Sequence, residues 1–150
     1  MEKDLLQLIT AALGSLGFSL IFNVRGRPLL FGALGGLIAW GVYLGCRGQG
    51  TSDVMGYLIS SMVITIYAEI CARRFRAPAT VFLMSSAIPL IPGGSLYRTM
   101  VYAVKMQGAE FLQAGTHTML LAGAISAGII LVSTVMHAYY AARGKGPGQL

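Results

Sequence analysis

Charged side chains are scarce in this sequence of 150 residues, of which 11% are charged and 55% are hydrophobic. Ordinary soluble domains carry about 25% charged residues. A single core of this size could not bury so much apolar surface. The scarcity of charge therefore excludes a soluble domain and indicates an integral membrane protein in contact with a lipid bilayer.

Several chemical signatures are also absent from the sequence. The two cysteines, Cys46 and Cys71, form no CxxC pair and have no histidine nearby, so neither a metal site nor a disulfide framework is expected. No Ser/His/Asp set, phosphate-binding glycine loop or nucleotide motif is present, so we expect no enzyme, no cofactor and no ATP-driven pump. The basic residues form no stripe, which argues against a nucleic-acid partner.

The apolar runs that remain predict an all-α protein with one transmembrane domain over residues 1–150. A helix needs about 20 mostly apolar residues to cross the hydrocarbon core. The predicted spans are 5–24, 28–44, 55–71, 79–91 and 116–142. The fourth span is short, and residues 95–113 mix polar and apolar side chains in an amphipathic segment.

The positions of the basic residues predict the orientation of these five crossings. One side of the membrane would hold seven of them, namely Arg25, Arg27, Arg73, Arg74, Arg76, Arg143 and Lys145. The other side would hold Lys3, Arg47, Arg98 and Lys105, offset by Glu2, Asp4, Asp53 and Glu110. The positive-inside rule then places the N-terminus outside and the C-terminus in the cytoplasm.

Small residues recur at helical spacing in the predicted spans. The pairs are Gly32 with Gly36, Gly41 with Gly45, and Ala124 with Gly128. In lipid such pairs let two helix backbones approach closely. We expect them to pack helices of one chain together, and a homo-oligomer formed through the same pairs stays open.

The fourth span is interrupted by residues that break helices. Pro89 and Pro92 each remove a backbone donor, and Gly93 and Gly94 permit backbone angles that other residues avoid. This pattern predicts a discontinuous helix, whose free backbone groups are tolerated in a membrane when they are buried in protein or line a wet cavity. The alternative is that the motif ends a span at the interface and begins a loop.

The residues after the break carry the predicted substrate contacts. Ser95 is the expected N-cap of a new helix that begins at Leu96. The N–H groups and positive dipole end of that helix would bind a carboxylate, as broken helices do in transporters. Arg98 lies one turn into the new helix and could add a charge-assisted contact.

Other polar residues within the spans have two interpretations. Glu69 is a candidate for proton coupling, because an intramembrane carboxylate suggests function. It also lies four residues before Arg73, so an ion pair along one helix is equally natural. Ser85 and Ser86 either bond to their own helix or line a path. His117 is expected to lie at a membrane interface rather than to act as a metal ligand.

Three stretches resemble the small membrane subunit of the threonine/serine exporter family. They are F-N-V-R-G-R-P at 22–28, R-R-F-R-A-P-A-T-V-F-L at 73–83 and I-P-L-I-P-G-G-S-L-Y-R-T-M at 88–100. The resemblance implies a two-component exporter of the bacterial cytoplasmic (inner) membrane, in which a larger membrane subunit is the partner. It implies succinate as the substrate of two-component systems, and threonine and serine as substrates of fused ones.

The sequence thus predicts one subunit of a secondary transporter that exports small carboxylate metabolites, driven by the proton gradient. The predicted substrate region consists of Pro89, Pro92, Gly93, Gly94, Ser95, Tyr97 and Arg98. Tyr97 joins this set because it follows the glycines in the resembling block. A non-transporting scaffold and a small homo-oligomeric channel are the alternatives.

Overall fold

The computed structural model describes residues 2–142, which form six α-helices and one 3₁₀ turn and contain no strand. The elements are α1 (Glu2–Ile21), α2 (Arg27–Gly48), α3 (Asp53–Phe75), α4 (Ala79–Ala87), the 3₁₀ turn η1 (Ile88–Leu90), α5 (Gly93–Val104) and α6 (Gly108–Ala142). The helices α1, α2, α3 and α6 are long and apolar enough to cross a membrane. The bent pair from α4 to α5 makes a fifth crossing if it is counted as one span. The all-α membrane architecture is therefore confirmed.

The helix ends differ from the predicted boundaries where the backbone turns left-handed. The first helix ends at Ile21 rather than at 24, because Asn23 adopts a positive φ of 57° and the Val24 N–H closes onto the Ser19 carbonyl. The amphipathic segment 95–113 is divided between α5 and the start of α6. Met106, with a φ of 55°, turns the chain between α5 and α6.

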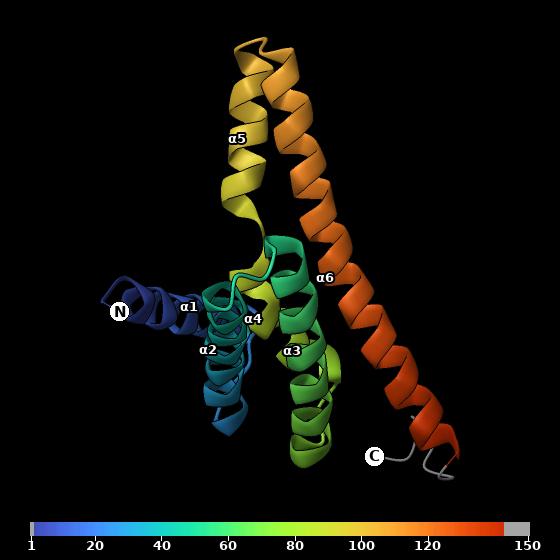
Figure 1. Ribbon diagram of the computed structural model, residues 1–150. Helices are drawn as coiled ribbons and strands as arrows, with labels where there is room; N and C mark the ends of the chain where they lie inside the picture. The colour runs from blue at the N-terminus through green and yellow to red at the C-terminus, as the bar shows by residue number, and fades with distance from the viewer. Residues whose placement is uncertain (1, 143–150) are drawn as a thin grey trace.

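The helices α1 to α4 form a bundle, and α5 extends beyond it (Figure 1). There α5 pairs with the first part of α6, which then runs back past α3. With 35 residues, α6 is about 52 Å long at 1.5 Å per residue, against a hydrocarbon core of about 30 Å. The pair α5–α6 is called the hairpin below.

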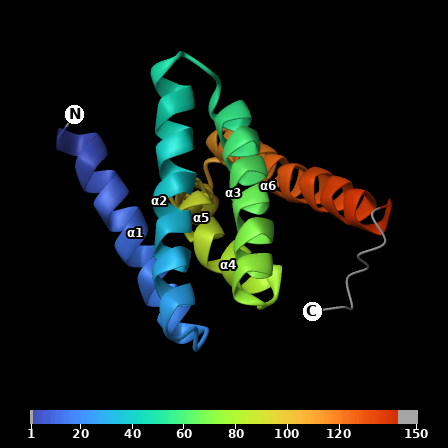
Figure 2. The same ribbon diagram turned by 90° about the horizontal axis from the view of Figure 1, so that it is seen from below.

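The connections gather at two ends of the bundle. The α1–α2 and α3–α4 turns lie at one end, and the N-terminus and the α2–α3 loop lie at the other (Figure 2). The first end carries Arg25, Arg27, Arg73, Arg74 and Arg76. Arg143 and Lys145, which the charge argument also used, lie outside the described residues. The predicted orientation in the membrane stays a prediction.

A glycine–serine seam holds the bundle together; it consists of Gly32, Gly35 and Gly36 on α2, Ser15 and Ser19 on α1, and Ser85 and Ser86 on α4. A Cβ added at Gly32 would overlap the Ser19 hydroxyl, and one added at Gly36 would overlap Ser15. The four serines are at most 1% exposed. The predicted packing of Gly32 and Gly36 within one chain is therefore confirmed.

A second close approach joins α3 to α6. A Cβ on Gly128 would lie 2.9 Å from the Leu58 carbonyl oxygen and 3.1 Å from the Cβ of Ser61. Ala124, one turn earlier, is buried in the core beside Leu121. This pair also packs within the chain, as predicted. A Cβ added at Gly45 would have no neighbour within 4 Å among the described residues, so its predicted packing role finds no support there.

Candidate functional site

The predicted break in the fourth span is present between η1 and α5. The helices on its two sides are bent by 54°. Ile91 is extended, with φ −63° and ψ 120°, and Pro92 follows with φ −77° and ψ 54°. Leu90 is fully buried in the core, which fixes the end of the first half. The chain direction therefore changes at Ile91 and Pro92.

Two details of the predicted break are wrong. Ser95 is not the N-cap, because α5 already begins at Gly93 and the Pro92 carbonyl accepts the Leu96 N–H at 2.9 Å. Gly93 and Gly94 do not adopt positive φ, so they belong to the ordinary first turn of α5. The ring of Pro92 already restricts its φ to a value compatible with helix entry, so the glycines need no special angles.

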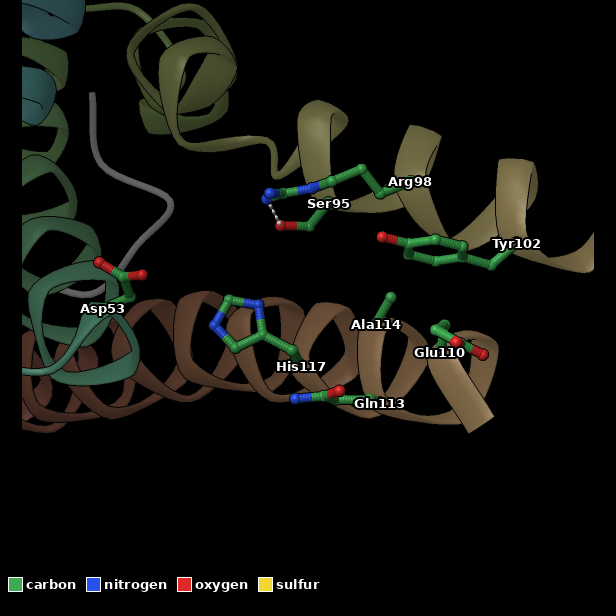
Figure 3. Close-up of a pocket in the computed structure, with 8 residues that line it drawn as sticks. All are labelled: Asp53, Ser95, Arg98, Tyr102, Glu110, Gln113, Ala114 and His117. Carbon is green, nitrogen blue, oxygen red and sulfur yellow. Dashed lines mark hydrogen bonds between the residues drawn. The ribbon is translucent and has the colours of Figure 1, made fainter. Parts of the chain in front are cut away.

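A polar cavity of about 480 Å³ lies beside the break, between the hairpin and the start of α3. Figure 3 shows the residues that line it, which are Asp53, Ser95, Arg98, Tyr102, Glu110, Gln113, Ala114 and His117. The α5 residues are three and four positions apart, and the α6 residues form two pairs at a spacing of four, Glu110 with Ala114 and Gln113 with His117, so each set occupies one helix face. The cavity therefore forms where two polar helix faces meet.

Hydroxyl groups hold the two sides of the cavity together. The Thr99 and Thr118 hydroxyl oxygens are 3.2 Å apart, across the α5–α6 contact. Each hydroxyl also lies within hydrogen-bond distance of a carbonyl of its own helix. Thr99 is paired in this way with the Ser95 carbonyl, and Thr118 with the Ala114 carbonyl. Gly115 packs beside the Thr99 methyl group, which would lie at an ordinary contact distance of 3.5 Å from an added Cβ. These contacts fix the spacing of the two polar faces.

The charged groups of the cavity are arranged without pairing to one another. The Arg98 guanidinium contacts the Ser95 hydroxyl at 3.5 Å. Within residues 2–142 neither Asp53 nor Glu110 comes within 4.0 Å of it as a salt-bridge partner. Asp53 and Glu110 lie towards opposite ends of the cavity in Figure 3, with Arg98 between them. A solute could therefore contact a cation and an anion together.

The carboxylate of Asp53 is held by a neighbouring helix. The Tyr43 hydroxyl of α2 donates to its Oδ1 at 2.9 Å. Asp53 is the first residue of α3, preceded by the N-cap Ser52, and a carboxylate there is favoured by the helix dipole. In the part of the chain that the structure describes, no side chain donates to the second carboxylate oxygen, and the residue lines the cavity.

The structure brings together some of the predicted substrate residues and separates others. Ser95 and Arg98 line the polar cavity. Tyr97 is 70% exposed and does not line it. Pro89 borders a different cavity of about 230 Å³, whose other lining residues are Gln7, Thr10, Ala11 and Trp40. The substrate roles predicted for Tyr97 and Pro89 stay predictions.

Sequence reasoning missed the contributions of α3 and α6 to the cavity. Asp53 and Glu110 entered the sequence argument as charges that balance one side of the membrane, and His117 as an interfacial residue. All three line the cavity with Arg98. The available signal was that the positive-inside rule places Asp53, Arg98 and Glu110 on the same side of the membrane.

Glu69 lies in a different region, towards the opposite end of α3. Its Oε2 is 3.6 Å from Nη2 of Arg73, so the predicted ion pair is present. The Arg73 guanidinium also lies 3.1 Å from the ring centroid of Tyr140 on α6, a cation–π contact. Proton coupling by Glu69 stays a prediction.

The mid-span serines also have distinct environments. The Ser85 hydroxyl donates to the Val81 carbonyl at 3.1 Å, which confirms bonding within its own helix. The Ser86 hydroxyl is fully buried against Gly35 and has no partner in the described part of the chain. Residues 2–142 contain no group of three or more His, Cys, Asp or Glu that could hold a metal ion.

Comparison of the sequence with known protein families finds a match. The family model described as "Threonine/Serine exporter, ThrE" matches residues 7–135, which include every residue that lines the polar cavity. No solved structure matches the chain.

Proposed function

This chain belongs to the threonine/serine exporter family, and we propose that it provides the substrate cavity of a secondary transporter for small amino acids. Membership of an exporter family indicates a multi-pass membrane transporter rather than an enzyme. The observation that carries the proposal is the shared cavity of Arg98 and Asp53, which are not paired with each other.

The charges of the cavity complement a zwitterion. Arg98 can bind a carboxylate through two parallel N–H bonds, and N–H groups of the first turn of α5 lie nearby. Asp53 can accept N–H bonds from an ammonium group. Tyr102, Gln113 and His117 supply hydrogen-bonding groups for a side-chain hydroxyl. The volume of about 480 Å³ lies within the range of small-ligand sites.

The same charges disfavour a dicarboxylate. Two carboxylates, Asp53 and Glu110, flank the one guanidinium of the cavity. If Arg98 held one carboxylate of succinate, the other would face like charge, which costs free energy. Threonine and serine are therefore the favoured substrates, and succinate would need basic groups from a partner.

A larger membrane subunit is the proposed partner that covers the apolar face of α5. No residue of α5 is buried, and among the helices described α5 packs chiefly against α6. Its apolar side chains Leu96, Met100 and Val104 are 48–85% exposed. A partner helix on this face, which lies on the side of α5 away from Ser95, Arg98 and Tyr102, would cover these three apolar side chains. The proposed location is the bacterial cytoplasmic membrane, with the N-terminus and the cavity on the outer side.

The proposed driving force is the proton gradient, with Glu69 as the coupling candidate. The side chain of Glu69 is 13% exposed and is held near Arg73 at the cytoplasmic end of α3 in the proposed orientation. A carboxylate that gains a proton and releases its arginine can couple proton movement to a conformational change in a membrane.

The decisive experiment measures efflux of serine, threonine and succinate from cells that express this chain, the larger subunit, or both. We expect serine and threonine efflux when both subunits are present. Efflux from this chain alone would instead favour a homo-oligomeric channel.

Substitution of Arg98 tests the site itself. Arg98→Ala should raise the KM for serine roughly ten- to hundredfold, because a hydrogen bond to a charged group contributes about 1.5–3 kcal/mol. Lys105→Ala is the matched control, since Lys105 lies on the hairpin turn and outside the cavity. Copurification of the two subunits checks assembly. Normal efflux by Arg98→Ala would remove the proposed role and favour a scaffold.

A further inference from the structure

We propose that Tyr43 is a positioning residue that gives the cavity its preference for an ammonium group over a hydroxyl group of the same size. The inference rests on the proposed amino-acid site, because it assigns the selectivity of that site. Tyr43 does not line the cavity; it acts through Asp53.

The first observation is the bond between the two side chains. The Tyr43 hydroxyl donates to Oδ1 of Asp53 at 2.9 Å. A neutral donor leaves the negative charge of the carboxylate intact, whereas an arginine partner would neutralise it. Because Oδ1 is occupied, Oδ2 is the oxygen left for a ligand. The bond therefore fixes both the charge and the direction of the acceptor.

The second observation is that Tyr43 is itself held firmly. Its side chain is 6% exposed, and its ring lies between Trp40, with centroids 4.8 Å apart, and Tyr57, at 4.9 Å edge to face. The ring also contacts α3 closely at Gly56, where an added Cβ would lie 3.1 Å from Cδ2. Packing on three sides leaves the ring one orientation, as a buried aromatic residue requires.

The third observation extends this support to α1. The Trp40 indole N–H donates to Oε1 of Gln7 at 3.1 Å. Gln7, Trp40 and Tyr43 thus connect α1 and α2 to the carboxylate at the start of α3. Asp53 itself is exposed and follows a loop that contains Gly50 with a φ of 76°. These three side chains, rather than the loop, hold the Asp53 carboxylate in place.

The geometry has a specific consequence for substrate choice. An ammonium group brings a positive charge and three N–H donors to a fixed carboxylate, whereas a hydroxyl brings one donor and no charge. Serine and glycerate differ in this one substituent. A precisely oriented Oδ2 therefore favours serine, and a freely rotating carboxylate loses part of that preference.

The test uses everted membrane vesicles that contain this chain together with the larger subunit. The KM for serine uptake and the inhibition constant of glycerate are measured for wild type and Tyr43→Phe. We expect Tyr43→Phe to raise the KM for serine about tenfold, which corresponds to the loss of one hydrogen bond to a charged group. The kcat and the inhibition constant of glycerate should stay unchanged.

Tyr57→Phe is the matched control. Tyr57 belongs to the same aromatic stack and is 8% exposed, and the Asp53 Oδ1 bond comes from Tyr43 instead. In Tyr57→Phe, the ratio of the serine KM to the glycerate inhibition constant should be the same as in wild type. If the ratio of the serine KM to the glycerate inhibition constant is unchanged in Tyr43→Phe, or rises equally in Tyr57→Phe, the proposal is overturned.

Asp53→Asn separates this inference from the proposed function. If Asp53→Asn leaves the KM for serine unchanged, the zwitterion site itself is wrong. If Asp53→Asn raises the KM while Tyr43→Phe does not, the site stands and the positioning role fails. Combining the two substitutions should add nothing to Asp53→Asn alone, because Tyr43 acts through that carboxylate. An additional loss in the double variant would contradict the inference.

Discussion

The glycine–serine seam and the hairpin use the same residue types for opposite purposes. In the seam, an added Cβ on Gly35 would lie 2.8 Å from the Cβ of Ser86 and 3.0 Å from a ring carbon of Tyr67. In the hairpin, Gly93 and Gly94 have nothing within 4 Å. Glycine therefore allows close helix contact in the seam, whereas at the start of α5 it leaves open space.

The polar groups of the two regions differ in the same way. The seam contains four buried serine hydroxyls, and two of them bond to their own helix, Ser19 to the Ser15 carbonyl at 2.8 Å and Ser85 to the Val81 carbonyl at 3.1 Å. The cavity of the hairpin contains a guanidinium and two carboxylates that are not paired with one another. A transporter needs a rigid frame and an accessible polar site, and this chain separates the two.

The largest expected effect comes from filling the seam. Gly35→Ala should lower the free energy of unfolding by about 1–3 kcal/mol, the usual cost of overpacking a core. Tyr67 cannot move away easily, because its hydroxyl donates to the Phe31 carbonyl at 2.7 Å. Unfolding in a denaturing detergent can be followed by the fluorescence of Trp40, the one tryptophan of the sequence.

Two variants sharpen this result. Gly45→Ala lies on the same helix with nothing within 4 Å, so it should not destabilise the protein. Ser86→Gly introduced together with Gly35→Ala moves the small residue to the facing helix and should recover part of the loss. Equal stability of Gly35→Ala and Gly45→Ala would show that the seam is not closely packed.

A smaller effect is expected at the contact between α3 and α6. Gly128→Ala places a Cβ 2.9 Å from the Leu58 carbonyl oxygen, which would push α6 outwards. We expect a loss of about 1 kcal/mol in the same unfolding assay, near the lower end for overpacking, because α6 lies at the periphery and can move. Gly123→Ala, with nothing within 4 Å, is the control on the same helix. If Gly123→Ala lost stability and Gly128→Ala did not, the close approach of α6 to α3 at Gly128 would be contradicted.

The sequence predicted the features that depend on local chemistry. Apolar runs located the spans, and Pro89 and Pro92 located the break. The N-cap was wrong because Pro92 itself provides the entry to α5, so Ser95 lies inside the first turn. The rule that favours serine at N-caps describes one helix end in isolation and does not say which of several candidates starts the helix.

The cavity could be predicted in part. Arg98 and Ser95 follow the break in sequence, so the break itself pointed to them. Asp53 reaches the cavity from α3 and His117 reaches it from α6. Whether these two residues meet Arg98 depends on how α5 pairs with α6 and where α6 passes the start of α3. A tertiary arrangement of this kind leaves no periodic pattern within one segment, so the position of Asp53 in the sequence does not indicate that it meets Arg98.

A still smaller effect, of opposite sign to that at Gly35, is expected at the start of the hairpin. Gly94→Ala should raise the free energy of unfolding by about 0.5–1 kcal/mol, because alanine is the better helix former and meets no neighbour here. The same unfolding assay measures it. A loss of stability would show that the position is as crowded as the seam.

The smallest effect on stability is expected at Glu69 on α3, which lies outside both the seam and the hairpin. Glu69→Gln removes an ion pair whose arginine is 36% exposed and still contacts Tyr140, so the free energy of unfolding should fall by less than about 0.5 kcal/mol. If Glu69 carries the coupling proton, everted vesicles should lose serine uptake driven by a proton gradient but keep serine exchange without one. Glu2→Gln, on the N-terminal helix and away from α3, should change neither rate. Gradient-driven uptake that persists in Glu69→Gln would leave this residue as an ion-pair partner of Arg73 and place proton coupling elsewhere in the transporter.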